Sequence, residues 1–258
     1  MTPPFESRWS RVNWLGVGTI FLLVLLWQLY KEVLASGLDS IASPGEILGA
    51  VRELVAGGPL MSEVAHTLWV AIMAWVLAVG GGVVLGTLLG VSRRGRMFSL
   101  TSIDVLRSIP SIAFVPIALL IFGFSVRTEM LIGVYVALWP VLLNTLDGVM
   151  SVPASLRETA RTLRLPRSRV LFSIVLPAAL PSILVGLRLA LALSVALIVV
   201  AEMLGNPAGL GYGLVYAQQA FHPQDVFAYV LVIGILGWLL NAVFVASTRA
   251  LFRGHEGL

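Results

Sequence analysis

The sequence alternates between long apolar runs and short polar segments. Each run is long enough for an α-helix to cross the hydrocarbon core of a bilayer, which takes about 20 mostly apolar residues. The pattern therefore predicts an all-α, polytopic membrane protein with six transmembrane helices, at about residues 14–30, 64–91, 108–124, 130–149, 184–204 and 226–246.

The first apolar run follows a basic segment that contains Arg8 and Arg11. The same order occurs in cleavable signal peptides, and the small residues Ala35-Ser36-Gly37 lie just beyond the run. The run is nevertheless long enough to span a bilayer, and aromatic residues lie at both of its ends, as interface anchors do. We therefore expect a retained first helix, preceded by a short cytoplasmic segment, residues 1–13.

Small residues recur every four positions in the second run, at Ala74, Ala78, Gly82, Gly86 and Gly90. The three glycines form two overlapping G-x-x-x-G units, which allow the backbones of two membrane helices to approach closely. The glycine face predicts close helix packing. Its partner is a helix of the same chain or of a second copy, and the same chain is the favoured interpretation.

The third run contains two prolines, and the fifth run contains an arginine. Pro110 and Pro116 predict a bend in the third run, after a mixed stretch at 98–109 that we expect along the inner membrane surface. Arg188 lies near the inner end of the fifth run, from which its long side chain would reach the interface.

The connection between the first two runs holds one structured piece. Ser43-Pro44-Gly45-Glu46 is a capping-box sequence with proline at the first helical position, and Gly57-Gly58-Pro59 predicts the helix end. The residues between them have an apolar face at helical spacing. This short helix is expected to lie along the membrane surface, with contact to an outside partner as the alternative.

The polar segment 152–181 between the fourth and fifth runs predicts a short amphipathic helix. Pro153 is acceptable at the start of a helix, and Pro166 ends it. Leu156, Ala160 and Leu163 share one face of that helix. Because a helix of about three turns is marginal alone, its apolar face needs a partner.

Composition restricts the protein class and charge indicates the orientation. Hydrophobic residues make up 58% of the chain and charged residues 12%, far fewer than the quarter typical of soluble domains. The net charge of +4 comes from arginines in short loops, which indicates membrane topology and not nucleic-acid binding. All basic residues except Lys31, Arg52 and Arg127 are internal when both termini and the segment 152–181 are cytoplasmic.

The residues that enzymes and ATPases require are missing from the sequence. The chain has no cysteine, and its histidines, His66, His222 and His255, are scattered, so we expect no catalytic, metal or cofactor site. A phosphate-binding G-x-x-x-x-G-K-[ST] loop is also absent, and Lys31 is the single lysine. If ATP drives this protein, another polypeptide must supply the energy.

A resemblance to a known family appears in the segment 152–181. Glu158-Thr159-Ala160, then Arg164, then Ile174-Val175-Leu176-Pro177 has the spacing of the EAA loop in permease subunits of bacterial ABC importers. Thr159 stands where the family has alanine, and Arg164 stands where it has glycine. Arginine at that glycine position puts the usual docking geometry in doubt.

Several short motifs, taken in order, are similar to the nitrate, sulfonate and taurine branch of these permeases. No single one is specific, and their order carries the resemblance: Ser43-Pro44, Ile109-Pro110, Phe122-Gly123, Asn144-Thr145, Ala201-Glu202-Met203 and Gly209-Leu210-Gly211.

The resemblance implies a fold and a set of partners. It implies a type I ABC importer permease fold, with residues 14–258 as a single transmembrane domain in a bacterial inner membrane. It also implies a homodimer, two ATPase subunits that bind ATP and magnesium, an extracytoplasmic substrate-binding protein, and a small anionic substrate such as a sulfonate, taurine, nitrate or bicarbonate. The residues implied in ATPase coupling are Leu156, Arg157, Glu158, Ala160, Arg161, Leu163 and Arg164.

Five residues are candidates for the pathway or its gate: Asn144, Thr145, Glu202, Gly209 and Gly211. A carboxylate at membrane depth is costly unless it is paired, hydrated or protonated. Glu202 is therefore either a pathway residue or a structural acceptor for backbone groups in the glycine-rich loop that follows it. Both interpretations stay open at the level of sequence.

A transporter or channel that works without partners is the second functional hypothesis. Ion-coupled carriers usually place ionisable groups inside the membrane. The apolar runs contain few such groups apart from Glu202 and Arg188. This scarcity favours a permease that is driven from outside the membrane.

Overall fold

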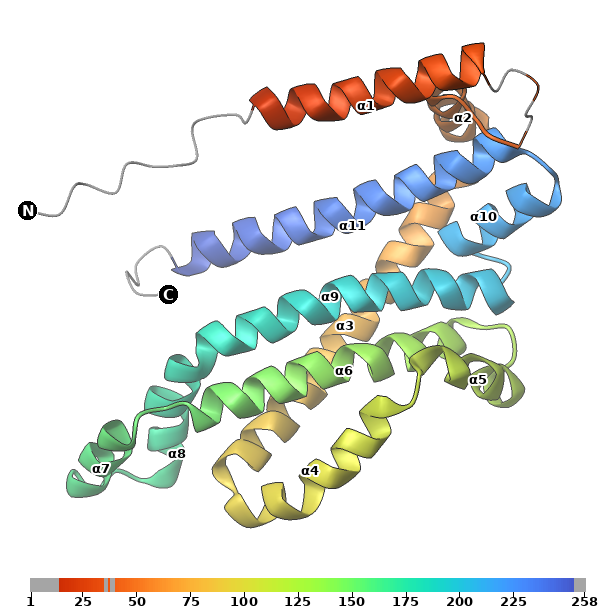
Figure 1. The fold of residues 1–258 in the computed structure, drawn as a ribbon. Helices are drawn as coiled ribbons and strands as arrows, with labels where there is room; N and C mark the ends of the chain where they lie inside the picture. Colours follow the sequence, from red (N-terminus) through yellow and green to blue (C-terminus); the bar gives the residue numbers. More distant parts are fainter. Residues whose placement is uncertain (1–13, 35–36, 38–39, 253–258) are drawn as a thin grey trace, which may run out of the picture.

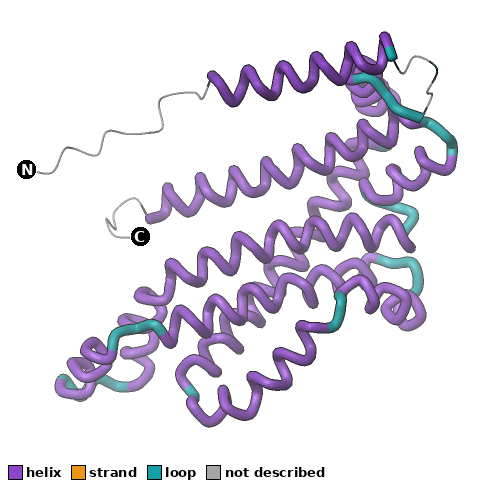
Figure 2. Tube along the Cα trace, in the orientation of Figure 1, coloured by secondary structure: helices purple, strands orange, loops and turns teal. Residues whose placement is uncertain are grey.

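The structure, a computed structural model, describes residues 14–252 except 35–36 and 38–39. The expected N-terminal segment 1–13 and Arg253 lie outside the described residues. Within the described part the chain is helical and contains no strand (Figure 2). The all-α prediction is confirmed.

The helices are numbered in chain order, with a 3-10 turn η1 and a π-helical turn η2 between them (Figure 1). Their bounds are α1 Trp14–Val33, α2 Pro44–Gly57, α3 Leu60–Val91, α4 Arg93–Ser108, η1 Ser111–Phe114, α5 Val115–Phe122, α6 Val126–Met150, α7 Ala154–Thr162, α8 Arg167–Val170, η2 Leu171–Val175, α9 Leu176–Gly205, α10 Leu210–Gln219 and α11 Pro223–Phe252.

Five stretches in the described part are long and apolar enough to cross a membrane: α1, α3, α6, α8 to α9, and α11. A sixth crossing is available if α4 and the segment Ser111–Phe122 act as one bent span, with 80° between them. The expected span at 108–124 is thus not one helix: the chain is extended at Ile109-Pro110, and α5 stops at Gly123, whose φ is +66°. Proline lacks an amide donor and glycine adopts positive φ readily, so both positions interrupt the helix.

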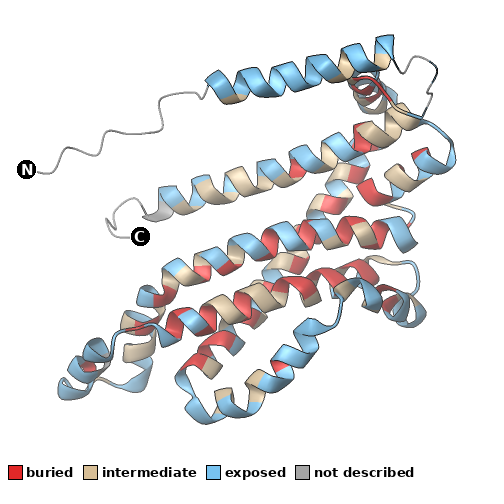
Figure 3. Ribbon diagram, viewed as in Figure 1, coloured by how far each residue is buried: buried red, intermediate tan, exposed pale blue. Residues whose placement is uncertain are grey.

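Helices α3, α6 and α9 form the packed centre of the chain, and most buried positions lie on them (Figure 3). The glycine face of α3 lies against α6. A Cβ added at Gly82 would lie 2.7 Å from the Cβ of Val141, and one at Gly90 would lie 2.6 Å from Val149. In this single chain the glycine face therefore packs on a helix of the same chain.

Replacing Gly86 with alanine is expected to destabilise the fold by about 1–3 kcal/mol, because overpacking a tight interface forces side chains and backbone to shift. The new Cβ would lie 2.5 Å from the carbonyl oxygen of Leu142. Gly80→Ala on the same helix is the matched control, since a Cβ there meets nothing within 4 Å. Unfolding in mixed detergent micelles measures both variants, and equal effects would contradict the packing.

Helices α1 and α2 lie outside this centre, with α2 packed mainly on α11 and α11 between α1 and α9 (Figure 1). The capping box predicted for α2 is present: the Ser43 hydroxyl accepts from the Glu46 amide, and the Glu46 carboxylate accepts from the Ser43 amide. That backbone hydrogen bond from Ser43 lowers the pKa of Glu46. Helix α1 buries none of its residues and contacts the start of α11 through Trp27 and Phe227, whose ring centroids lie 6.0 Å apart. Such an exposed apolar helix is suited to a lipid environment.

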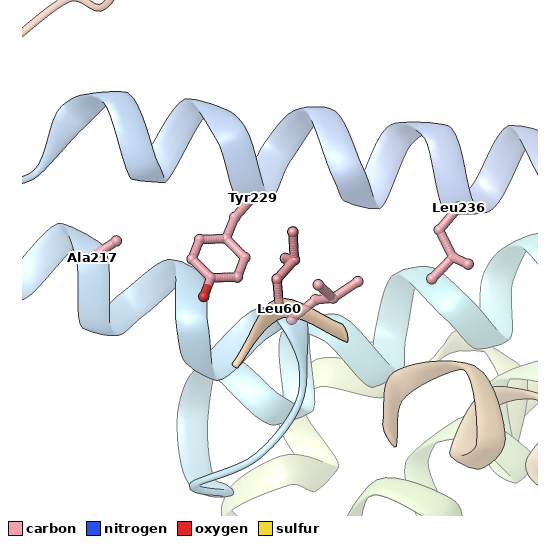
Figure 4. Packing of buried hydrophobic residues seen from close by; sticks show 5 residues of the cluster. Leu60, Ala217, Tyr229 and Leu236 are labelled. Atoms are coloured by element: carbon pink, nitrogen blue, oxygen red, sulfur yellow. The ribbon is translucent and has the colours of Figure 1, made fainter. Parts of the chain in front are cut away.

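A separate apolar cluster joins α10 and α11 to the start of α3 (Figure 4). Tyr229 points from α11 toward α10, where it leaves no room for a side chain at Gly213. Its hydroxyl donates to the buried carboxylate of Glu63, at 2.7 Å. The cluster fixes the glycine-rich loop between α9 and α10 against the membrane helices.

Helix α9 begins at Leu176, earlier than the expected span start near residue 184. Pro177 lies in its first turn, where proline is tolerated, and Pro181 is accommodated inside the helix. The earlier start places Arg188 about 18 Å along the helix, at 1.5 Å per residue. Arg188 therefore lies well inside helix α9, although it is close to the start of the expected span.

Candidate functional site

The bundle has two ends with different chemistry. Helices α7 and α8 lie at one end, together with the end of α6 and the start of α9, and α10 lies at the other (Figure 1). We refer to them as the α7 end and the α10 end. The sequence candidates for coupling lie at the first, and Glu202, Gly209 and Gly211 lie at the second.

Glu202 is the centre of a buried polar network at the α10 end. Its carboxylate is 1% exposed and accepts two hydrogen bonds, from the Thr67 hydroxyl at 2.7 Å and from the Gly211 amide at 2.9 Å. The Thr67 oxygen in turn accepts from the amide of Leu210, at 2.9 Å. Glu202 thus has the geometry of the structural acceptor, one of the two interpretations that the sequence left open.

The two glycines beside Glu202 are required by the close approach of the loop. Gly209 has φ of +90°, and a Cβ on it would overlap the Glu202 carboxylate. A Cβ on Gly211 would overlap the carbonyl oxygen of Val199. Only glycine lets the backbone pass this close to α9 and donate to the carboxylate.

A second buried carboxylate, Glu129, extends the network. It is fully buried near the start of α6 and accepts from the side chain of Asn206, while its other oxygen lies 3.0 Å from Nε2 of His66. Neither Glu129 nor Asn206 was predicted from the sequence as a site residue, and His66 is far from the other histidines in the sequence. Glu129 comes just before the predicted span, so a carboxylate at the edge of an apolar run was the available signal.

His66, Glu129 and Glu202 each offer one ligand atom, and these atoms lie within 4.8 Å of one another. A metal ion accepts such a donor set, with one imidazole and two carboxylates. Every carboxylate oxygen of the two glutamates, however, already has a hydrogen-bond partner among the described residues. The network therefore needs no ion for its polar groups to be satisfied, and it joins α3, α6, α9 and the loop before α10.

Asn144 and Thr145 do not lie in this network. Thr145 is fully buried on α6 against Gly86, and the side-chain amide of Asn144 donates to the carbonyl of Pro140 within the same helix. Thr145 lies about 24 Å along α6 from Glu129, at 1.5 Å per residue. The structure thus separates the pathway candidates into two groups.

At the α7 end, α7 follows α6 after a short turn at Pro153. Ala160 is buried against the rest of the chain, whereas Leu156 is 42% exposed and Leu163 is 65% exposed. Glu158, Arg161 and Arg164 are exposed as well, and the side chain of Arg157 lies outside the described residues. The helix therefore presents two leucines that no part of the described chain covers.

Arg164 ends α7 in a left-handed conformation, with φ of +50°. Its amide donates to the carbonyl of Arg161, and the Leu165 amide donates to the carbonyl of Ala160. These two bonds form a Schellman motif, in which the left-handed position is usually glycine. The arginine thus occupies a left-handed position that glycine usually takes in this motif, at a conformational cost of roughly 1 kcal/mol.

Arg164→Gly is expected to stabilise the end of α7, because glycine occupies this φ without a Cβ penalty. A gain of roughly 1 kcal/mol slows hydrogen exchange of the α7 amides about fivefold. Arg161→Gly, inside the same helix, should instead speed exchange. The exchange rates of the α7 amides are measured by mass spectrometry. Unchanged or faster exchange in Arg164→Gly would mean that the turn is not left-handed.

A groove of about 750 Å³ lies between α7 and α8. Arg161, Arg164 and Arg167 line it, together with apolar side chains that include Val170 and Phe172. Its lining combines positive charge with apolar surface. Such a surface suits a partner that offers acidic and apolar side chains.

Comparison with known proteins identifies relatives over most of the chain. Residues 82–255 match the family model described as "Binding-protein-dependent transport system inner membrane component". The chain is 30% identical to the putative aliphatic sulfonates transport permease protein SsuC of Bacillus subtilis, over 96% of this chain and 91% of that protein. It is 31% identical to the nitrate import permease protein NrtB of Leptolyngbya laminosa, over 88% and 84%.

A further relative and a solved structure agree with these matches. The bicarbonate transport system permease protein CmpB of Synechococcus elongatus is 37% identical over 64% of this chain and 59% of that protein. An inward-facing structure of the MetNI methionine ABC transporter matches with a TM-score of 0.65, 20% identity, and coverage of 74% of this chain and 94% of that chain. The fold is that of a type I ABC importer permease, as expected from the sequence.

Proposed function

Because the chain belongs to the family of binding-protein-dependent transport system inner membrane components, we propose that it is the membrane subunit through which a separate ATPase drives uptake of a small anion. Two copies would form the translocation pathway between them. ATP and magnesium would bind to the ATPase subunits, and an extracytoplasmic protein would deliver the substrate. The chain itself would carry out no chemical reaction.

The single observation that carries the proposal is the surface of α7. Leu156 and Leu163 are exposed on a short helix that leaves the bundle directly after α6. Exposed leucines are ordinary on membrane-spanning helices, but α7 is a short, mostly polar helix whose other apolar residues are two alanines, and Leu163 directly follows its last residue. An apolar pair on a protruding polar helix fits a protein partner.

The groove beside α7 supports the same role. Its three arginines, Arg161, Arg164 and Arg167, are exposed and border apolar surface. An ATPase cleft with acidic residues would match this charge and would also cover the leucines. Helices α6 and α9 both lead from this end of the chain to the Glu202 network. Movement of α7 would therefore be transmitted to the α10 end by two packed helices.

The proposed orientation places the α7 end in the cytoplasm. The basic residues Arg93, Arg94 and Arg96 follow α3 at that end, and an excess of arginine and lysine marks cytoplasmic loops. The start of α1 and the end of α11 lie at the same end (Figure 1). Both chain termini would then be cytoplasmic, and the Glu202 network would lie near the outer surface.

A small anion is the proposed substrate class. Two relatives that cover most of this chain are named for aliphatic sulfonates and for nitrate, and another is named for bicarbonate. These ions share a planar or tetrahedral group of oxygens that carries negative charge. A pathway for them requires few and well-placed positive groups.

Reconstitution tests the proposal directly. The chain is purified with its co-expressed ATPase and inserted into vesicles, with the binding protein added on the outer side. Uptake of labelled taurine, nitrate and bicarbonate should require both ATP and the ATPase. Transport by the chain alone, without nucleotide, would instead establish a partner-independent transporter or channel.

A further inference from the structure

Arg188 lies at a depth where a charged side chain is not expected to face lipid. Arg188 lies about 18 Å from the start of α9, a helix about 45 Å long. The carbonyl of the preceding residue, Leu187, accepts from Nε1 of Trp75 at 2.9 Å, and Trp75 lies midway along the membrane helix α3. Asn241 on α11 lies about 17 Å from the end of its helix, at a similar depth. The first distance is counted from the start of α9 and the second from the end of α11, and both of these helix ends lie at the α7 end (Figure 1).

The guanidinium of Arg188 has a neutral partner. Its Nε donates to Oδ1 of Asn241, at 2.8 Å. None of the ion pairs between described residues involves Arg188, and its side chain is exposed in the single chain. The bond fixes the plane of the guanidinium and leaves its two Nη groups without a hydrogen bond to the described residues. An uncompensated cation at this depth is costly unless water or an anion reaches it.

The surface beside this pair is hollow. A groove of about 260 Å³ runs between α9 and α11. Arg188 and Asn241 are its polar lining residues, and the rest of its lining is apolar side chains and glycines. A Cβ added at Gly234 or Gly237, which also line the groove, would meet nothing within 4 Å. The volume equals that of on the order of eight water molecules. A small anion with part of its hydration shell fits into this space.

The charge, its depth and the open groove point to one ligand chemistry. A guanidinium presents parallel N–H groups that match two oxygens of a planar or tetrahedral oxyanion. We propose that Arg188, held in place by Asn241, binds the small oxyanionic substrate within the membrane, and that the groove between α9 and α11 faces the water-filled pathway. This inference rests on the proposed function, because it assigns an anion-selecting residue to that pathway.

The absence of cysteine from the natural chain allows a test of the groove that does not need uptake. Gly237→Cys places one thiol in the groove of the full chain in lipid nanodiscs. The thiol is treated with two methanethiosulfonates of similar size, one carrying an ethylsulfonate group and the other a trimethylammonium group. The anionic reagent should react at least about tenfold faster relative to a free thiol in solution, because the charge of Arg188 attracts anions into the groove.

Second variants distinguish the possible outcomes. Adding Arg188→Gln to Gly237→Cys should remove the preference for the anionic reagent, and Arg188→Lys should keep much of it. Leu23→Cys on α1, where Leu23 is 60% exposed, is the control for a lipid-facing position and should react with neither reagent. A thiol at 237 that is equally unreactive would mean that the groove faces lipid or a second copy, and would overturn the inference. A preference that survives Arg188→Gln would also overturn it.

Uptake separates this inference from the proposed function. In the vesicle assay with the ATPase and the binding protein, Arg188→Gln should reduce uptake of labelled anion at least about tenfold while ATP hydrolysis continues. If the wild-type complex shows no ATP-dependent uptake, the proposed function fails. The labelling experiment needs only the purified chain, so it tests the groove independently of uptake. Full uptake by Arg188→Gln would overturn the role of Arg188 alone.

Discussion

Glu202→Ala is expected to lower the stability of the folded chain by about 3 kcal/mol or more. The change removes the acceptor for the Thr67 hydroxyl and for the Gly211 amide, both of which are buried. A buried donor left without a partner costs about 1–3 kcal/mol. The alanine also leaves a cavity where the carboxylate lay against Gly209, which adds to the cost.

Two variants make this prediction specific. Met203→Ala changes the next residue of α9, which is 36% exposed, and should alter stability by less than about 1 kcal/mol. Thr67→Val keeps the shape of the side chain and removes its donor. Its effect should be strongly non-additive with Glu202→Ala, because both act on one network.

Unfolding in mixed detergent micelles, followed by helical circular dichroism, is the measurement. If Glu202→Ala remains as stable as the parent while uptake is lost, Glu202 acts in the pathway and not as a structural acceptor. In that case the hydrogen bonds that connect α3, α9 and the loop before α10 contribute little to the fold.

Replacing both Leu156 and Leu163 with serine is expected to reduce ATP-dependent uptake by at least about tenfold. The leucines are 42% and 65% exposed, so the stability of the chain alone should change by no more than about 0.5 kcal/mol each. At a docking surface the same residues would bury apolar area, and losing two leucines costs a few kcal/mol of binding. The ATPase should then dissociate or hydrolyse ATP without driving transport.

The matched control is the double change of Ser155 and Thr162 to alanine. Both residues are exposed on α7, and each lies next to one leucine in sequence but about 100° round the helix from it. This variant should retain most of the uptake and the bound ATPase. Equal losses in the two double variants would indicate damage to α7 as a whole and not the loss of an apolar contact.

The sequence was sufficient where a pattern repeats over a long helix. The four-residue spacing from Gly82 to Gly90 predicted a close helix contact, and those glycines lie against α6. The capping box at Ser43 was readable from four residues because both of its hydrogen bonds are local. The all-α class followed from the apolar runs alone.

Features that depend on tertiary contacts were not available from the sequence. Glu129 lies near Glu202 only because α6 and α9 pack side by side, and the hydrogen bond of Glu129 to Asn206 crosses a loop whose path the sequence does not give. The prolines predicted a bend in the third span, but the sequence did not show that the chain breaks into separate helices at Ile109-Pro110 and that α5 ends at Gly123. The start of α9 at Leu176 was misjudged because Pro177 and Pro181 suggested a later helix start.

The position of Arg164 shows what geometry adds to a motif. From the sequence, arginine in place of the family glycine put the docking turn in doubt. In the structure Arg164 adopts the left-handed φ of +50° and completes the Schellman motif. Arg164 therefore adds a positive charge at a left-handed turn position that usually holds glycine.

The central claim is that α7 is the contact site of a separate ATPase, and one crosslinking measurement tests it most directly. In the cysteine-free chain, Thr162→Cys places a thiol on α7, and Gln219→Cys places one at the α10 end. A short thiol-to-amine crosslinker is added to the co-purified complex. Our account predicts that Thr162→Cys is joined to a nucleotide-binding polypeptide and Gln219→Cys is not. Crosslinking of that polypeptide from Gln219→Cys alone, or a complex that transports without any such polypeptide, would contradict it.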